Sequence, residues 1–103
     1  MLRVLQKDGV PVTTSAGAVA QVWRSGSRQA TLARALSGVE NAPIDDESCR
    51  AIGELLRGGG TTDIVDAHVA LLVPDGGTVL TSDPSDISSL LKARRAKATV
   101  VRL

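Results

Sequence analysis

The sequence predicts a small α/β domain with a short parallel sheet, and three observations support this prediction. Short Val-rich runs alternate with segments of helical periodicity, which is typical of strands joined by crossover helices. Each junction between these segments carries a turn or capping residue. The 103 residues include one aromatic, so the core must consist of Val, Leu, Ile and Ala. Such a core favours helices packed on a buried sheet over an aromatic-rich β-sandwich.

The chain begins with a segment that has the pattern of the end of a helix. Residues 1–8 form this segment, which stops at Gly9. Residues 10–13 then predict a short strand. Ser15 is the predicted N-cap of the next helix, because its hydroxyl can accept a hydrogen bond from a free backbone N–H. Trp23 falls on the apolar face of that helix and is expected in the core.

A Ser-Gly-Ser break at residues 25–27 separates this helix from a second one. Gly38 ends the second helix, since glycine readily adopts the left-handed conformation at a helix C-terminus. Residues 39–44 predict another strand. Asp45 then caps a helix with Cys, Ile and Leu at helical spacing, which ends at the glycine run 58–60.

The last part of the chain predicts two further helices and two further strands. A helix extends from about residue 62 to residue 73, and the Asp-Gly-Gly turn at 75–77 leads into a strand at 78–81. The Asp-Pro pair at 83–84 starts another helix, because proline is favoured at the first helical position. Residues 98–101 predict the final strand.

Composition excludes several classes of function. Twelve Lys and Arg against eleven Asp and Glu give a net charge of +1, which argues against purely electrostatic binding of nucleic acid but leaves a local patch open. With only Cys49 and His68, a disulfide framework within one chain, a Cys-based zinc site and a His-rich metal site are excluded. No apolar run approaches the roughly 18 residues of a membrane span, and the start lacks a signal-peptide pattern. We therefore expect a cytoplasmic protein.

Two acids lie at the start of the predicted helix 62–73, whose apolar residues occupy all of its faces. These acids are Asp63 and Asp66, three residues apart. Burying a carboxylate without a partner is costly or forces its protonation, so a cation, a metal ion or exposure at a cleft should offset the burial. The alternative is that both acids only interact with the positive helix N-terminus, which is the stronger interpretation for Asp63.

A second acidic pair, Asp83 and Asp86, follows the strand at 78–81 and starts the next helix. Ligands bind at the carboxyl ends of strands in open parallel sheets, although an Asp before Pro84 is also ordinary helix-start chemistry. If the two pairs converge, their carboxylates suit one hard divalent cation, Mg²⁺ or Mn²⁺. Such ions commonly serve phosphoryl transfer.

Basic residues are the candidates for contact with nucleic acid phosphates. Those that we expect to bind RNA are Arg24, Arg28, Arg94 and Arg95. The last two belong to a cluster that also contains Lys92 and Lys97. The alternative for this cluster is that it complements the dipole at the C-terminus of the last helix.

In this order, these pieces resemble a PIN domain, and most closely the small bacterial PIN proteins related to VapC-type toxins of toxin–antitoxin pairs. The similarity runs from about Val10 to the C-terminus. The segments that carry it are Val10–Val12, Ala18–Arg24, Asp63–Ala70 and Thr78–Asp83.

The resemblance implies that residues 1–103 form a single PIN-like domain, a three-layer α/β sandwich with a short parallel sheet. It also implies an N-terminal truncation, since the family's first strand and its catalytic Asp would precede Met1. Asp66 and Asp83 match catalytic and metal-binding acids of the family, and Asp63 and Asp86 are neighbours that would add to the metal site. Gln21 falls where the family carries a Glu, and its neutral amide can line the site by orienting a water or an oxygen.

The implied activity is that of a hydrolase, an endoribonuclease that depends on Mg²⁺ or Mn²⁺ and cleaves RNA phosphodiester bonds. The implied partners are RNA, an antitoxin protein and a second copy of the chain in a homodimer, with no membrane. The alternative is a catalytically impaired PIN-like remnant that only binds a partner. Gln21 and the absent first acid favour this alternative.

Overall fold

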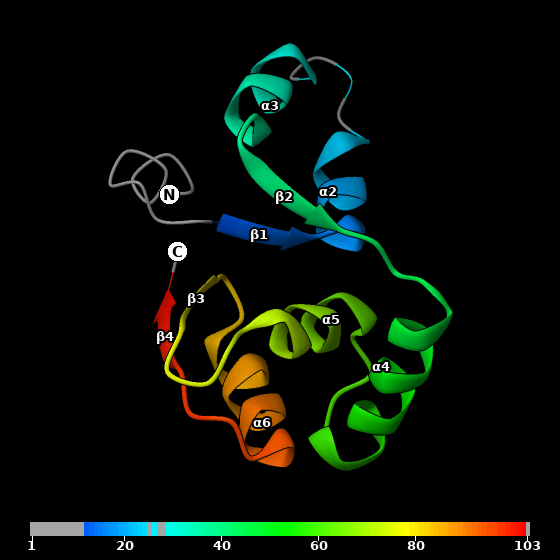
Figure 1. Cartoon of the computed structure of the whole chain (residues 1–103), viewed down its shortest axis with the longest axis vertical. Helices are drawn as coiled ribbons and strands as arrows, with labels where there is room; N and C mark the ends of the chain where they lie inside the picture. The colour runs from blue at the N-terminus through cyan, green and yellow to red at the C-terminus, as the bar shows by residue number, and fades with distance from the viewer. Residues whose placement is uncertain (1–11, 25, 27–28, 103) are drawn as a thin grey trace. The chain divides into compact units, whose positions relative to one another are not determined.

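The computed structural model describes residues 12–24, 26 and 29–102 (Figure 1), and within them the chain has an α/β fold. The chain divides into two compact units, Met1–Pro43 and Ile44–Leu103, which we call the N-terminal unit and the C-terminal unit. Among the described residues, each unit contains one two-stranded parallel sheet. The predicted parallel strands are therefore confirmed, and they are divided between two sheets.

The N-terminal unit has two strands and two helices among its described residues. They are β1 (Val12–Ser15), α2 (Ala16–Trp23), α3 (Gln29–Leu36) and β2 (Val39–Ala42). The predicted cap at Ser15 is confirmed, because its hydroxyl accepts a hydrogen bond from the Gly17 N–H at 3.1 Å. Ser15 is also the last residue of β1, so the chain passes directly from strand to helix. Gly38, with φ +83°, follows α3 as predicted, whereas β2 ends at Ala42 instead of residue 44.

The prediction that Trp23 lies in the core is wrong. Its side chain is 37% exposed, and neither α2 nor α3 has a buried residue. Within the described part of this unit, α2 packs mainly against β1 and β2. Two strands of four residues offer too little surface to cover an indole on the last residue of the helix.

The C-terminal unit has three helices that pack against one another and a second sheet. Its elements are α4 (Asp46–Gly59), α5 (Ile64–Leu72), β3 (Thr78–Thr81), α6 (Pro84–Arg94) and β4 (Thr99–Arg102). The predicted N-cap Asp45 accepts a hydrogen bond from the Ser48 N–H at 2.8 Å. β3 has its predicted bounds, and α6 begins at Pro84 as predicted. The register of the sheet pairs Thr81 with Arg102 at the carboxyl ends of the strands.

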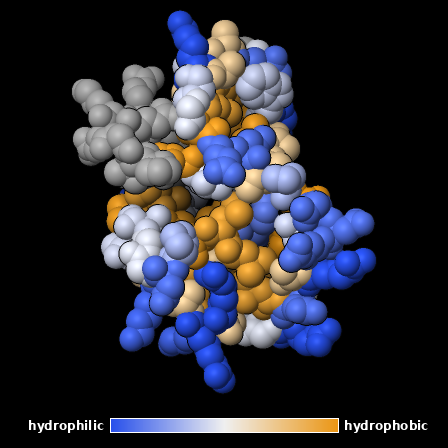
Figure 2. Space-filling view, in the orientation of Figure 1, coloured by the Kyte–Doolittle hydropathy of each residue, from blue (hydrophilic) through white to orange (hydrophobic). Residues whose placement is uncertain are grey.

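The C-terminal unit holds most of the described core, which is aliphatic as predicted. Its buried members are Ile52, Leu55, Ala67, Ala70, Val73, Val79, Ile87, Leu90 and Leu91. Figure 2 shows apolar residues gathered in the middle of this unit, with hydrophilic side chains around its edges. His68 on α5 is also buried, as expected for an apolar helix. None of the described helices combines the length and apolar character needed to cross a bilayer.

Arg94 connects the end of α6 to the end of α5. Its Nη1 donates hydrogen bonds to the carbonyl oxygens of Ala70 at 3.0 Å and Val73 at 2.8 Å. The last carbonyls of a helix have no partner inside the helix, so the guanidinium satisfies groups that burial would otherwise leave unpaired. The two helices that carry the acidic pairs are thereby held together.

Candidate functional site

The same short pattern, Thr-x-Asp-x-x-Asp, begins both α5 and α6. It occupies residues 61–66 and 81–86. In the first copy the Asp63 N–H donates to Thr61 Oγ1 at 3.2 Å, and in the second the Asp83 N–H donates to Thr81 Oγ1 at 2.9 Å. A threonine turn thus delivers an aspartate to the N-cap of each helix.

The two N-cap aspartates differ in what their side chains do. Asp63 Oδ1 accepts a hydrogen bond from the Asp66 N–H at 2.9 Å, which confirms the capping interpretation for Asp63. Asp83 is exposed and forms no capping bond, and its backbone angles of φ −119° and ψ 62° depart from the extended conformation usual at an N-cap. Its carboxylate therefore remains available for a ligand.

Asp66 is the most unusual acid in the described structure. Its side chain is only 8% exposed, and its buried Oδ2 has no hydrogen-bond partner among the described residues. Burial, followed by the negative charges of Asp63, Asp83 and Asp86, raises the pKa of Asp66 to about 6. The three acids are thus near enough for their charges to act on Asp66.

Members of both acidic pairs that the sequence singled out thus lie within electrostatic range of Asp66. In the conformation described, no group of three Asp, Glu, His or Cys side chains among the described residues is arranged to hold a metal ion. Asp83 and Asp86 are exposed to solvent. Four carboxylates, one of them with an unpartnered buried oxygen, nevertheless match the ligand chemistry of a hard divalent cation.

The other predicted site residues have different surroundings. Gln21 and Arg24 are exposed in the N-terminal unit, and Arg28 lies outside the described residues. Arg95 is exposed at the end of α6. Arg94 is half-buried and donates to the carbonyls that end α5, a different helix from the one whose dipole it was expected to complement.

Two residues near the acids were not singled out from the sequence. Thr81 is buried and orients the backbone of Asp83, and Arg102 lies opposite Thr81 in the sheet. Repetition of the Thr-x-Asp-x-x-Asp pattern would have identified Thr81. Arg102 carries no such signal, because its place depends on the pairing of β3 with β4.

A scan against family models matched no protein family, and searches of curated proteins and of solved structures found no significant match. The relation to PIN domains therefore stays a prediction. The chemistry of the acidic residues at the starts of α5 and α6 is the ground on which a function can be proposed.

Proposed function

We propose that this chain is a metal-dependent endoribonuclease of the PIN type, related to toxin ribonucleases of the VapC kind. The observation that supports this most is the buried carboxyl group of Asp66, which has an unpartnered oxygen and three acidic neighbours. A structural acid in a core would be expected to have a hydrogen-bond partner or a cationic neighbour. Asp66 has neither among the described residues, and a divalent cation would supply what is missing.

Each acid has a distinct part in this proposal. Asp66 and Asp83 would hold Mg²⁺ or Mn²⁺, with Asp63 and Asp86 adding negative charge. When bound, such an ion lowers the pKa of a water and neutralises charge on the scissile phosphate. Asp63 fixes the first turn of α5 through its bond to the Asp66 N–H, which keeps the Asp66 carboxyl in place. Asp83 is exposed, so a substrate in solution can reach it.

The remaining expectations belong to the same proposal. We also propose a PIN-like three-layer sandwich with a short sheet, and the α/β fold with its parallel strands of four residues supports the α/β part of this proposal. We propose RNA as the substrate, an antitoxin protein as the inhibitor, a homodimer as the assembly and the cytoplasm as the location. The composition of the chain and the resemblance to toxin proteins support these proposals.

Cleavage of a fluorogenic single-stranded RNA by the purified protein tests the proposed activity. We expect cleavage with Mg²⁺ or Mn²⁺ and none with EDTA. Asp66→Asn and Asp83→Asn should each reduce the rate by more than about a hundredfold, because loss of a metal ligand costs more than loss of a supporting partner. Glu54→Gln is the matched control, since Glu54 is an exposed acid on α4 outside the cluster. Absence of cleavage by folded protein with either metal would contradict the proposal.

A second candidate function is that of a catalytically impaired PIN-like protein that only binds a partner. The neutral Gln21 and the lack of a ready three-ligand arrangement among the described residues favour it. Thermal unfolding distinguishes the two functions, since a ligand that binds only the folded state raises the Tm. A rise of more than about 2 °C with Mn²⁺, abolished by Asp66→Asn, would argue for the nuclease.

A further inference from the structure

The C-terminal unit has a shallow groove of about 340 Å³ between the second half of α6 and β4. Leu91, Ala96 and Val100 contribute an apolar floor, and they are buried or half-buried. Lys92 and Lys97 also line the groove, and both are exposed. The groove therefore combines an apolar surface with two exposed cationic side chains.

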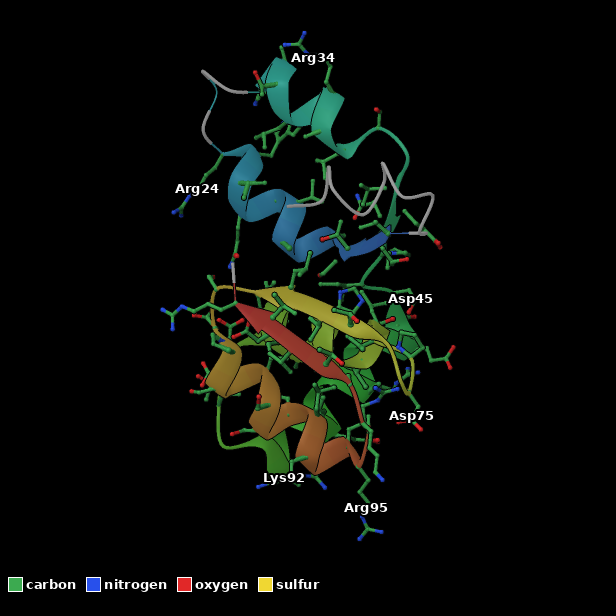
Figure 3. All side chains as sticks on the ribbon, turned by 90° about the vertical axis from the view of Figure 1, so that its left-hand side faces the viewer. Arg24, Arg34, Asp45, Asp75, Lys92 and Arg95 are labelled. Atoms are coloured by element: carbon green, nitrogen blue, oxygen red, sulfur yellow. The ribbon has the colours of Figure 1, made fainter. Side chains whose placement is uncertain are left out.

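The surroundings of the groove are positively charged. Arg95 lies between the two lysines in the chain, and Figure 3 shows Lys92 and Arg95 pointing outward from the end of α6. None of these three cations forms an ion pair with a described residue. The nearby acid is Asp75, which accepts a hydrogen bond from the Lys97 backbone N–H at 2.7 Å. A net positive charge remains for a ligand.

β4 runs from the groove toward the carboxyl ends of the strands, where Thr81 precedes Asp83. Val100 lines the groove, and Arg102 lies on the same face of the strand because side chains two residues apart point to the same side. Arg102 pairs in register with Thr81, whose Oγ1 accepts the Asp83 N–H. From Thr99 to Arg102 the strand covers about 10 Å. Arg102 thus places a cation at the end of β4 that pairs with Thr81, two residues before Asp83.

We propose that this groove binds the stretch of single-stranded RNA next to the bond that is cleaved, with Lys92, Lys97 and Arg102 as its phosphate contacts. This inference rests on the proposed nuclease function. The apolar floor suits a ribose or base face, and lysine and arginine suit the phosphates. A single strand is favoured over a duplex because its unstacked bases can reach the apolar floor, whereas a duplex presents mainly its phosphates.

Fluorescence anisotropy with a short labelled RNA of mixed sequence, in EDTA so that no cleavage occurs, tests this inference. The double variant Lys92→Gln/Lys97→Gln should bind about tenfold more weakly, and the slope of log K against log salt should fall by about 1.4. Arg102→Gln should lower the slope by about 0.7. The control is Arg50→Gln/Arg57→Gln, which removes the same charge from exposed positions on α4.

The outcomes separate this inference from the nuclease proposal. Equal binding by the groove variants and the control would overturn the inference, even if the wild-type protein cleaves RNA. Selective loss of binding in the groove variants would support it, even if cleavage is never seen. A duplex that binds as tightly as the single strand, or polyglutamate that displaces the RNA at equal charge concentration, would also overturn it.

Discussion

At the level of single residues, Asp66 differs from the other described acids because its carboxyl group is buried and its Oδ2 is unpartnered. Burial and the three neighbouring acids favour the protonated form, so in the absence of metal the charged form destabilises the fold. A residue that lowers stability in the free protein and binds a cation in the working protein would show the trade-off between stability and function that is common at active sites.

The burial of the Asp66 carboxyl group predicts how the free energy of unfolding of the metal-free protein depends on pH. The pKa of Asp66 is about 6 in the folded state against an ordinary value of 3.8, so the folded state binds the proton more tightly. Proton binding by Asp66 therefore stabilises the folded state. This stabilisation is fully present below about pH 4 and is lost as pH rises through 6. We expect Asp66→Asn to be more stable than wild type at pH 7 by about 1–2 kcal/mol, after allowing for solvent screening near the exposed Asp83 and Asp86.

Urea unfolding of both proteins in EDTA at pH 4 and pH 7 measures this effect. The difference between wild type and Asp66→Asn should be small at pH 4 and large at pH 7. Glu54→Gln should leave the stability nearly unchanged at both values, because Glu54 is exposed. A variant that is less stable than wild type at pH 7 would show that Asp66 has a structural partner, and would contradict the prediction.

A second residue-scale prediction concerns Arg94. Arg94→Ala removes the hydrogen bonds to the carbonyls of Ala70 and Val73, which leaves two partly buried acceptors unpaired. We expect the free energy of unfolding to fall by about 2 kcal/mol in urea. Arg95→Ala is the control, because Arg95 is the neighbouring exposed arginine and donates no side-chain bond to a described residue. Equal effects of the two substitutions would contradict the role given to Arg94.

Single residues were predictable from the sequence where their role is local. Caps such as Ser15 and Asp45 depend on the following few residues, so the sequence contains all the information needed. The role of Asp83 was harder to predict, because whether its side chain caps α6 depends on the backbone angles that β3 and Thr81 impose. The role of Arg94 depends on a contact with a helix more than twenty residues earlier in the chain.

At the level of elements, α4 and α6 are packed closely at one glycine. A Cβ added at Gly59 would clash with the side chain of Leu90, which is fully buried and has little room to move. We expect Gly59→Ala to destabilise the protein by about 1–3 kcal/mol. Gly58→Ala, one residue earlier in the same helix, should stabilise it by up to about 1 kcal/mol, because its Cβ would meet no atom within 4 Å. Urea unfolding measures both, and a loss of stability in both variants would refute the packing argument.

Element bounds were predicted best where a residue with special backbone chemistry marks them. β3 lies between a glycine turn and an Asp-Pro pair, and its predicted bounds are confirmed. α4 ends as predicted at the glycine run, with Gly60 at φ +74°. β2 has no such marker at its end, so the apolar Ile44 was included although the strand stops at Ala42.

On the scale of the whole molecule, the two units differ in how much of their surface is buried. α2 and α3 have no buried residue, whereas α5 and α6 supply most of the aliphatic core. We expect the backbone amides of α2 and α3 to exchange with deuterium at least about tenfold faster than those of α5 and α6. Hydrogen exchange followed by mass spectrometry tests this expectation, and equal protection of the four helices would contradict it.

The α/β class was predictable from the alternation of Val-rich runs and helical segments, because each run or segment can be recognised from its own residues. The division of the strands between two sheets was not, since pairing depends on contacts between distant segments. The gathering of the four acids was predictable only as a hypothesis. It required both helices to begin at the same place in the fold, which no spacing along the sequence determines.

The exposed position of Trp23 has a consequence for how this protein is studied. The chain has no Tyr or Phe, so its intrinsic fluorescence originates from one indole in the N-terminal unit. Emission spectra therefore report directly on the surroundings of Trp23, and circular dichroism follows the helices of both units. Coincident melting curves from the two optical probes would identify a single cooperative transition, and separate curves would identify two.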